Sequence, residues 1–284
     1  MAIGLARQGI DVSYLSSLSD DSFGDQLLGS LLKEGVQIPL KRRSLWPTSL
    51  ALVTINEQHQ PDYRLYREGV ADKDTSFEEI VGNLPEKLRI FHTGSLAITP
   101  SQLPKIRKVF SLMRERGVLI SIDINIRIRA SVDREKYIDG VRSLLQMADI
   151  IKASDEDLLE LALDADVRTS AKIACREMGE GLLVLTEGSD GAIVYSAQGM
   201  VARPAYRVSK VVDTVGAGDT FYSAFLACLV REWPCSATAT NAGLDVLGRA
   251  LNYACAAAAI NVSRAGCSPP DDRDVRGFIA IAES

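Results

Sequence analysis

The most constraining feature of this 284-residue sequence is a regular alternation of short apolar runs with amphipathic segments between Leu88 and Tyr195. The apolar runs have the length of buried strands, and the segments between them repeat apolar residues at helical spacing. The alternation predicts βαβ units and a parallel sheet, hence an α/β fold. We expect strands at 89–92, 118–123, 149–152, 182–186 and 191–195, and helices at 104–116, 137–147, 156–162 and 170–178.

Polar residues follow four of these predicted strands, at 93–95, 123–125, 152–154 and 186–188. In an open parallel sheet, ligands bind beyond the carboxyl ends of the strands. We therefore expect these polar tails to meet at one edge of the sheet and to form a binding site there.

The run DTVGAGDTF, from Asp213 to Phe221, is predicted to join an alternating, β-branched strand at 206–212 to a helix. The first N–H groups of a helix lack partners inside it and carry a partial positive charge, so they bind oxyanions. The small residues Gly216, Ala217 and Gly218 would let such an anion approach the backbone closely. The run therefore predicts a phosphate site.

Asp219 is unexpected beside a phosphate site, because its carboxylate would repel phosphate. A carboxylate there can instead accept the proton of a substrate hydroxyl as that oxygen attacks phosphorus. Two alternatives stay open: Asp219 only caps the first helical turn, or the glycines begin a dinucleotide-binding G-x-G-x-x-G in which Phe221 replaces the third glycine. The sequence contains no G-x-x-x-x-G-K-[ST], which excludes a Walker phosphate loop.

The same run resembles the D-T-x-G-A-G-D-x-F pattern of the PfkB, or ribokinase-like, family of carbohydrate kinases, and the resemblance is greatest to fructokinases. It implies one ribokinase-like domain over 1–284, a three-layer sandwich with helices on both faces of a mostly parallel sheet. It implies transfer of the γ-phosphoryl group of ATP to a small sugar, with fructose expected and 2-keto-3-deoxygluconate or ribose as alternatives. Asp219 would be the catalytic base, and the amides of Gly216, Ala217 and Gly218 would form the anion hole.

The resemblance assigns further residues to the site. Arg127 would clamp the transferring phosphate, on one face with Asp123 and Asn125 if the strand geometry continues, or else form a surface salt bridge. Helix capping, a plain β-turn and core packing are the competing interpretations at Ser154, 186–191 and Cys255. The assigned residues are Arg127 and Thr214 for phosphate; Lys152, Ser154, Thr186, Gly188, Gly191 and Cys255 for the nucleotide; and Tyr66, Arg67, Gly94, Asp123, Asn125 and Asp219 for the sugar.

The metals implied by the resemblance are Mg²⁺, held through water by Glu156 or Asp157, and K⁺, held by Asp213 with carbonyls of 264–269. A structural zinc site is not expected, because the five cysteines are widely spaced without a C-x-x-C pair. With only His59 and His92 available, a histidine metal centre or a Ser-His-Asp hydrolase is disfavoured, and we expect His92 to be structural.

Residues from about 36 to 68 contain two β-rich pieces, 49–55 and 62–66, around a polar turn at 56–61. We interpret this segment as a β lid that closes over the substrates and excludes water. The alternative is an edge hairpin or the surface of a homodimer.

The N-terminal region begins with a predicted helix at 2–8 and shows no strand before it. Resembling chains carry a strand with a sugar-binding carboxylate and a Gly-Gly turn ahead of this helix, so the first strand is expected to be missing. A catalytically silent, kinase-like binding protein is therefore the alternative to an active enzyme.

Composition excludes several other classes of protein. The net charge is −5 and the basic residues are scattered, so no nucleic-acid surface is expected. No apolar run reaches about 18 residues and no leader peptide is recognisable, so neither a membrane span nor secretion is expected, and the cytoplasm is the predicted location.

Overall fold

The structure, a computed structural model, describes residues 1–55, 61–232 and 242–283. Most of the predicted turn at 56–61, His59 and Cys235 lie outside the described residues. The central sheet has six strands, of which the first four run parallel and the last two are antiparallel, as expected for a mostly parallel sheet. In spatial order they are β3 (Ile90–Gly94), β4 (Leu119–Asp123), β5 (Ile150–Ser154), β6 (Leu182–Thr186), β7 (Ala192–Ser196) and β8 (Gly199–Arg203).

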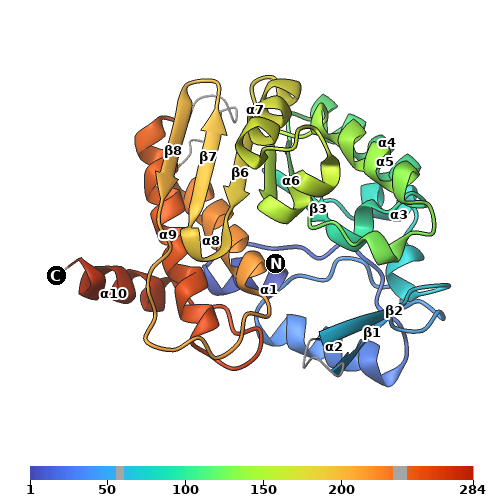
Figure 1. Cartoon of the computed structure of the whole chain (residues 1–284). Helices are drawn as coiled ribbons and strands as arrows, with labels where there is room; N and C mark the ends of the chain where they lie inside the picture. The colour runs from blue at the N-terminus through green and yellow to red at the C-terminus, as the bar shows by residue number, and fades with distance from the viewer. Residues whose placement is uncertain (56–60, 233–241, 284) are drawn as a thin grey trace.

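Two layers of helices cover the sheet because successive strand residues point to opposite faces. Leu183 and Leu185 pack with one layer, whereas Leu182 and Val184 pack with the other. Figure 1 shows this three-layer arrangement. The first layer contains α4 (Leu103–Glu115), α5 (Arg134–Leu145), α6 (Asp155–Leu161) and α7 (Val167–Met178), and the second contains α8 (Ala217–Glu232) and α9 (Leu244–Val262), with α1 (Ala2–Arg7) against α8 and α10 (Asp272–Ala282) against α9.

The predicted hairpin forms a separate two-stranded antiparallel sheet of β1 (Leu50–Ile55) and β2 (Pro61–Tyr66). Figure 1 shows it projecting beyond the end of the central sheet. No strand covers 36–49, so the β structure is shorter than the predicted segment. The remaining elements are α2 (Ser22–Lys33), α3 (Phe77–Gly82) and the 3-10 turns η1 (Ala71–Lys73), η2 (Ser95–Ile98), η3 (Ile128–Ala130) and η4 (Gly188–Asp190).

The prediction of a strand at 206–212 is wrong, because this segment is irregular. The N–H groups of Val212 and Asp213 donate to the carbonyl of Val262, at 2.8 and 3.3 Å. The C-terminal end of α9 therefore holds this segment, and its β-branched side chains do not pair with a sheet.

In the described part of the chain, α1 is the first element and β3 forms one edge of the central sheet. The segment after α1 is extended and pairs with Gln37 instead of β3. Tyr14 N–H donates to the Gln37 carbonyl at 2.9 Å, and Gln37 N–H donates to the Val12 carbonyl at 2.8 Å.

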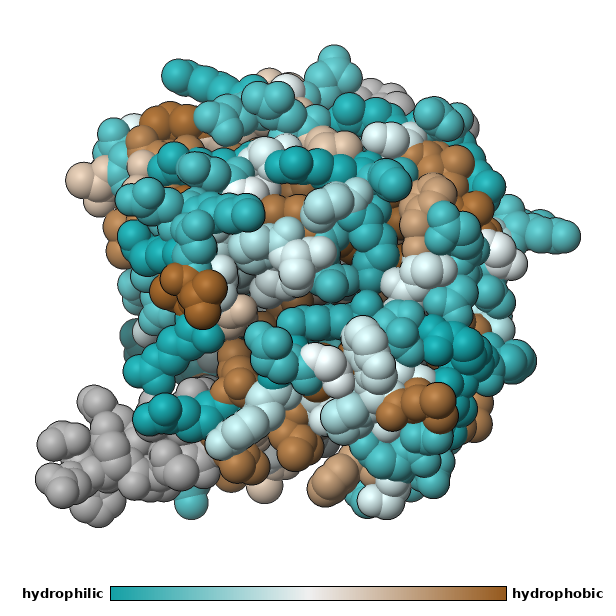
Figure 2. Space-filling view, turned by 90° about the vertical axis from the view of Figure 1, so that its right-hand side faces the viewer, coloured by the Kyte–Doolittle hydropathy of each residue, from teal (hydrophilic) through white to brown (hydrophobic). Residues whose placement is uncertain are grey.

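The surface is polar on the face shown in Figure 2, where apolar residues occur in small scattered groups. None of the helices in the described ranges has the length and apolar character needed to cross a membrane.

Candidate active site

The predicted phosphate turn lies at the N-terminal end of α8, which begins at Ala217. Gly216, immediately before it, has a φ of +75°, a conformation that strongly favours glycine. A Cβ at this position would lie 2.2 Å from Cys267 Sγ. Both the backbone conformation and the neighbouring thiol therefore require glycine at 216.

The amides of this turn point out of the helix at its mouth. Ala217 N–H donates to the carbonyl of Thr214 at 3.2 Å. The amides of Gly216, Gly218 and Asp219 have no backbone acceptor among the residues that the structure describes. The Ala217 amide is therefore engaged in closing the turn, whereas the amides of Gly216, Gly218 and Asp219 are not engaged by backbone.

Asp219 lies in the first turn of α8, and its side chain is 44% exposed. The α-ammonium of Met1 lies 3.5 Å from its Oδ1. The next two residues, Thr220 and Phe221, are buried. The Asp219 carboxylate therefore stands at the surface of the turn, within reach of a bound ligand.

A buried ion pair lies beneath the turn. The register of β4 and β5 pairs Asp123 with Lys152, and their side chains, each 6% exposed, are 2.9 Å apart. Burial raises the pKa of Asp123, and the charge of Lys152 opposes that shift. Lys152 Nζ also lies 3.4 Å from the position that a Cβ on Gly218 would occupy. The structure thus brings these three predicted site residues together at the carboxyl ends of the strands.

Ser154 caps α6, as predicted, in a reciprocal capping box with Asp157. Asp157 Oδ2 accepts from Ser154 N–H at 2.9 Å, and Oδ1 accepts from Ile126 N–H at 2.7 Å. Asp157 is buried, and each of its oxygens accepts one backbone N–H, so this side chain links the segments that follow β4 and β5. The side chain of Glu156, the other candidate for holding Mg²⁺ through water, is exposed.

The expectation that Asp123, Asn125 and Arg127 share one face is wrong. The extended geometry ends with β4 at Asp123, and Asn125 has a φ of +37°. The chain turns here because Asp157 holds the next amide, that of Ile126. Arg127 is exposed at the start of η3.

The predicted hairpin at 186–191 joins β6 to β7 through η4, and Glu187 N–H donates to the Gly191 carbonyl at 2.9 Å. Gly188 and Gly191 have φ values of +55° and +107°. Cys255, predicted to lie near the base, is instead 5% exposed within the core between the sheet and α9.

Asp213 bridges the turn and the segment after α9, as predicted. Its Oδ1 accepts from Val215 N–H at 2.9 Å, and its Oδ2 accepts from Gly266 N–H at 3.0 Å. These bonds lower the pKa of Asp213. Thr214 is exposed beside it. In the described ranges, no group of three or more His, Cys, Asp or Glu side chains could hold a metal ion.

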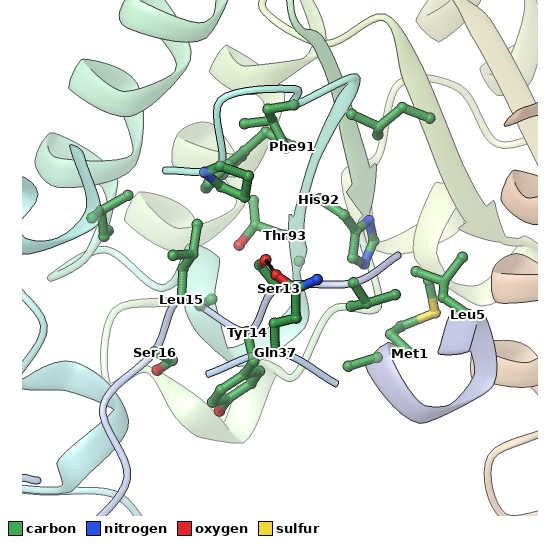
Figure 3. Close-up of a pocket in the computed structure, with 18 of the residues that line it drawn as sticks. Met1, Leu5, Ser13, Tyr14, Leu15, Ser16, Gln37, Phe91, His92 and Thr93 are labelled. Carbon is green, nitrogen blue, oxygen red and sulfur yellow. Dashed lines mark hydrogen bonds between the residues drawn. The ribbon is translucent and has the colours of Figure 1, made fainter. Parts of the chain in front are cut away.

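A cavity of about 860 Å³ lies along the free edge of β3. Figure 3 shows His92 and Thr93 of β3 on one side, the segment of Ser13 to Ser16 opposite, and Met1 and Leu5 beside His92. The predicted sugar residues Arg67 and Gly94 line it. Tyr66, by contrast, is 58% exposed on the hairpin and does not line the cavity.

Two features of the cavity escaped the sequence analysis. Arg67 Nη2 pairs with Asp72 Oδ2 at 2.5 Å, and the only available signal was a charge pair five residues apart around Gly69. His92 Nδ1 lies 3.1 Å from Ser121 Oγ, which lies 2.7 Å from the Tyr222 hydroxyl. No sequence spacing indicates this contact between β3, β4 and α8.

Burial lowers the pKa of His92 from 6.5 to about 4. The unfolded chain binds this proton near pH 6.5, so between pH 6.5 and 4 the unfolded state holds more protons and the free energy of unfolding falls as the pH falls. We expect His92→Asn to remove roughly 2–3 kcal/mol of this pH dependence. Urea unfolding of the parent and of His92→Asn from pH 7 to pH 4 measures this difference. If the free energy of unfolding has the same pH dependence in both proteins, the prediction is contradicted.

Comparison with known proteins decides the family. The family model described as pfkB family carbohydrate kinase matches residues 1–273. The chain belongs to the pfkB family of carbohydrate kinases. The match confirms the predicted family and its carbohydrate-kinase class.

This pfkB kinase is 31% identical to a fructokinase of Rhizobium leguminosarum bv. trifolii, over 81% of the chain and 70% of the relative. A fructokinase from Xylella fastidiosa with bound ATP superposes with a TM-score of 0.89 at 24% identity, over 100% of this chain and 89% of that one. A putative ribokinase II from E. coli, in complex with ATP and Mg²⁺, has a TM-score of 0.81 at 26% identity, over 99% and 87%. These neighbours confirm the ribokinase-like fold.

Proposed function

We propose that this pfkB kinase transfers the γ-phosphoryl group of ATP to a hydroxyl of a small sugar, with fructose as the acceptor and the β1–β2 hairpin excluding solvent from the substrates. The observation that carries the proposal is the exposed Asp219 carboxylate beside the free amides of Gly216 and Gly218 at the mouth of α8. The relatives named fructokinase support the choice of sugar.

The turn would supply the two functions that phosphoryl transfer needs. Asp219 would accept the proton of the attacking hydroxyl, because its carboxylate stands at the turn and not in the core. The free amides and the N-terminal end of α8 would stabilise the negative charge on the transferring group. Lys152, held against Gly218 by Asp123, would add a positive charge there.

ATP would lie across the carboxyl ends of β5 and β6, where Ser154 and Thr186 are neighbours in register. The hairpin at 186–191 would contact the nucleotide, and exposed Arg127 and Thr214 would reach its phosphates. Mg²⁺ supplies charge neutralisation on the donor phosphates, and Glu156 would hold its waters. A lone exposed carboxylate fits a magnesium ion that takes its other ligands from phosphate and water.

The acceptor sugar would occupy the β3 cavity. Arg67 and Gly94 line it, and so does Met1, whose ammonium contacts Asp219. Through Met1, the cavity therefore adjoins the predicted base, although Asp219 itself does not line it. Asp213 would contribute to a K⁺ site only through its remaining lone pairs, since an amide already occupies each oxygen.

The proposal is tested by a coupled assay for ADP with fructose, ribose and 2-keto-3-deoxygluconate. We expect sugar-dependent ADP release, greatest with fructose. Binding of ATP without ADP release from any sugar would favour the silent binding protein. If ADP is released with ribose or 2-keto-3-deoxygluconate and not with fructose, the protein is a sugar kinase, but fructose is not its acceptor.

The hairpin also offers a surface for a homodimer. Leu50 and Leu52, on one face of β1, are 38% and 51% exposed. Burying them against a second copy would remove apolar surface from water. Sedimentation equilibrium of the parent and of Leu52→Asp checks this: we expect a dimer that the variant dissociates, and a monomeric parent would contradict it.

A further inference from the structure

A buried side-chain amide from α9 holds three parts of the chain around the turn before α8. Asn261, in the last turn of α9, has an exposed fraction of 0%. Its Nδ2 donates to the Val215 carbonyl at 3.0 Å. Its Oδ1 accepts from Thr220 Oγ1 at 3.2 Å and from Ser268 N–H at 3.0 Å. One side chain therefore joins the turn, the first turn of α8 and the segment after α9.

The partners of Asn261 require both ends of an amide. The Val215 carbonyl needs a donor and the Ser268 N–H needs an acceptor, so the nitrogen and the oxygen of the amide cannot exchange places. A carboxylate offers no donor, and an aliphatic side chain offers neither group. Replacing Asn261 by either would therefore leave buried polar groups without partners, which proteins rarely tolerate.

The bond to Val215 fixes the direction of the next amide. The Val215 carbonyl and the Gly216 N–H belong to one planar trans peptide, in which these two groups point in opposite directions. Because the carbonyl points to buried Asn261, the Gly216 N–H points away from it. That amide has no backbone acceptor among the described residues. An N–H group in this direction is available to an anion bound at the N-terminal end of α8.

The glycine by itself does not select this direction. Turning the peptide over would change ψ of Val215 and φ of Gly216, and glycine accepts both signs of φ. The observed φ of Gly216 is +75°. The turned peptide would aim the Val215 carbonyl at the anion and withdraw the N–H from it. A contact from outside the turn is needed to hold the observed orientation, and Asn261 supplies one.

We infer that Asn261 is a positioning residue of the phosphate site: it holds the Val215–Gly216 peptide so that the Gly216 N–H faces the transferring phosphoryl group. The inference rests on the proposed function, which places this group at the mouth of α8. Asn261 acts through the turn and touches no substrate, since its side chain is fully buried. Its bond to Ser268 also holds the segment of Cys267, whose Sγ lies against Gly216.

Asn261→Asp tests the donated hydrogen bond. The variant keeps the shape of the side chain and the oxygen that accepts from Thr220 and Ser268, but it places a second oxygen opposite the Val215 carbonyl. Two acceptors repel each other, so the peptide should turn over. At pH 8, with ATP and the preferred sugar, we expect kcat to fall about 100-fold. KM for both substrates should stay within about threefold, because the N–H acts on the transition state.

Two further variants identify which bond matters. Thr220→Val removes a bond that Asn261 accepts and leaves the bond to Val215 in place, so its kcat should stay within about threefold of the parent value. Asn261→Leu has a similar volume and loses all three bonds without adding a charge. It should lower kcat as Asn261→Asp does, and it carries the test if the charged variant does not fold. Melting temperatures show which variants are folded at the assay temperature.

Crystal structures of the parent and of the two Asn261 variants show the direction of the Val215 carbonyl independently of activity. A turned carbonyl together with a lower kcat supports the inference. The inference is overturned by a carbonyl that keeps the parent direction, by an unchanged kcat, or by a loss confined to KM. A Thr220→Val enzyme as slow as Asn261→Asp overturns it as well.

The same measurements separate the inference from the proposed function. A parent that transfers no phosphoryl group to any sugar overturns the proposed function. The direction of the Val215 carbonyl then decides the inference alone. If it turns over in the Asn261 variants, Asn261 sets the direction of the Gly216 amide, and if it keeps the parent direction, the inference fails too.

Discussion

Asp219→Asn is expected to lower kcat by about 10²–10⁴-fold, because the amide cannot accept the proton of the attacking hydroxyl. Asp219 is half exposed in the first turn of α8, and its carboxylate contacts the Met1 ammonium at 3.5 Å. The substitution keeps the side-chain shape, so folding should change little. Steady-state kinetics of ADP release, with the melting temperature measured alongside, checks the prediction.

The matched control for Asp219→Asn is Asp155→Asn, because Asp155 also lies in the first turn of a helix, at the start of α6. We expect that variant to keep the parent kcat within about threefold, the scale of a lost helix-end charge. An Asp219→Asn enzyme with kcat within threefold of the parent would remove Asp219 from the role of base.

Gly216→Ala is expected to lower kcat by about 10²–10³-fold, the usual effect of disturbing one donor of an anion hole. The φ of +75° strains any residue with a Cβ, and that Cβ would lie 2.2 Å from Cys267 Sγ and 2.9 Å from Cys267 Cβ. The turn must shift to relieve this contact, and the free amides of Gly216 and Gly218 shift with it.

Gly117→Ala separates the strain from the contact. Gly117 has a φ of +67°, and a Cβ there would meet nothing within 4 Å. Both variants should lose about 1 kcal/mol of stability from the left-handed backbone, but only Gly216→Ala should lose activity. A Gly216→Ala enzyme with the parent kcat would show that the turn does not form the anion hole.

Elements are predictable from the sequence where the local pattern and the tertiary structure require the same residues. Strand β6 was predicted at its observed bounds, Leu182–Thr186, because a fully buried parallel strand is a continuous apolar run. The start of α8 within DTVGAGDTF followed from its glycines, since Gly216 adopts a φ that other residues avoid. The family resemblance rested on the same nine residues.

The incorrect predictions have a common physical cause. Contacts with other parts of the chain decide the conformation or the position of each of these segments. The β-branched segment at 206–212 has strand composition, yet α9 holds its backbone. Alternation through Asp123, Asn125 and Arg127 stops because Asp157 binds the Ile126 amide from another element. Cys255 lies in the core because of the face of α9 on which it falls.

By itself, the sequence determined the α/β class, the parallel strands and the glycine turn before α8, because helical and strand periodicity and the backbone freedom of glycine are local properties. Only the tertiary structure decided which polar groups meet. The pairing of Asp123 with Lys152 beneath Gly218, the occupation of both Asp157 oxygens by backbone, and the unpaired Oδ1 of Asp72 all depend on contacts between elements. Hydrogen bonds and ion pairs act over a few ångströms in space, and distance along the chain does not encode them.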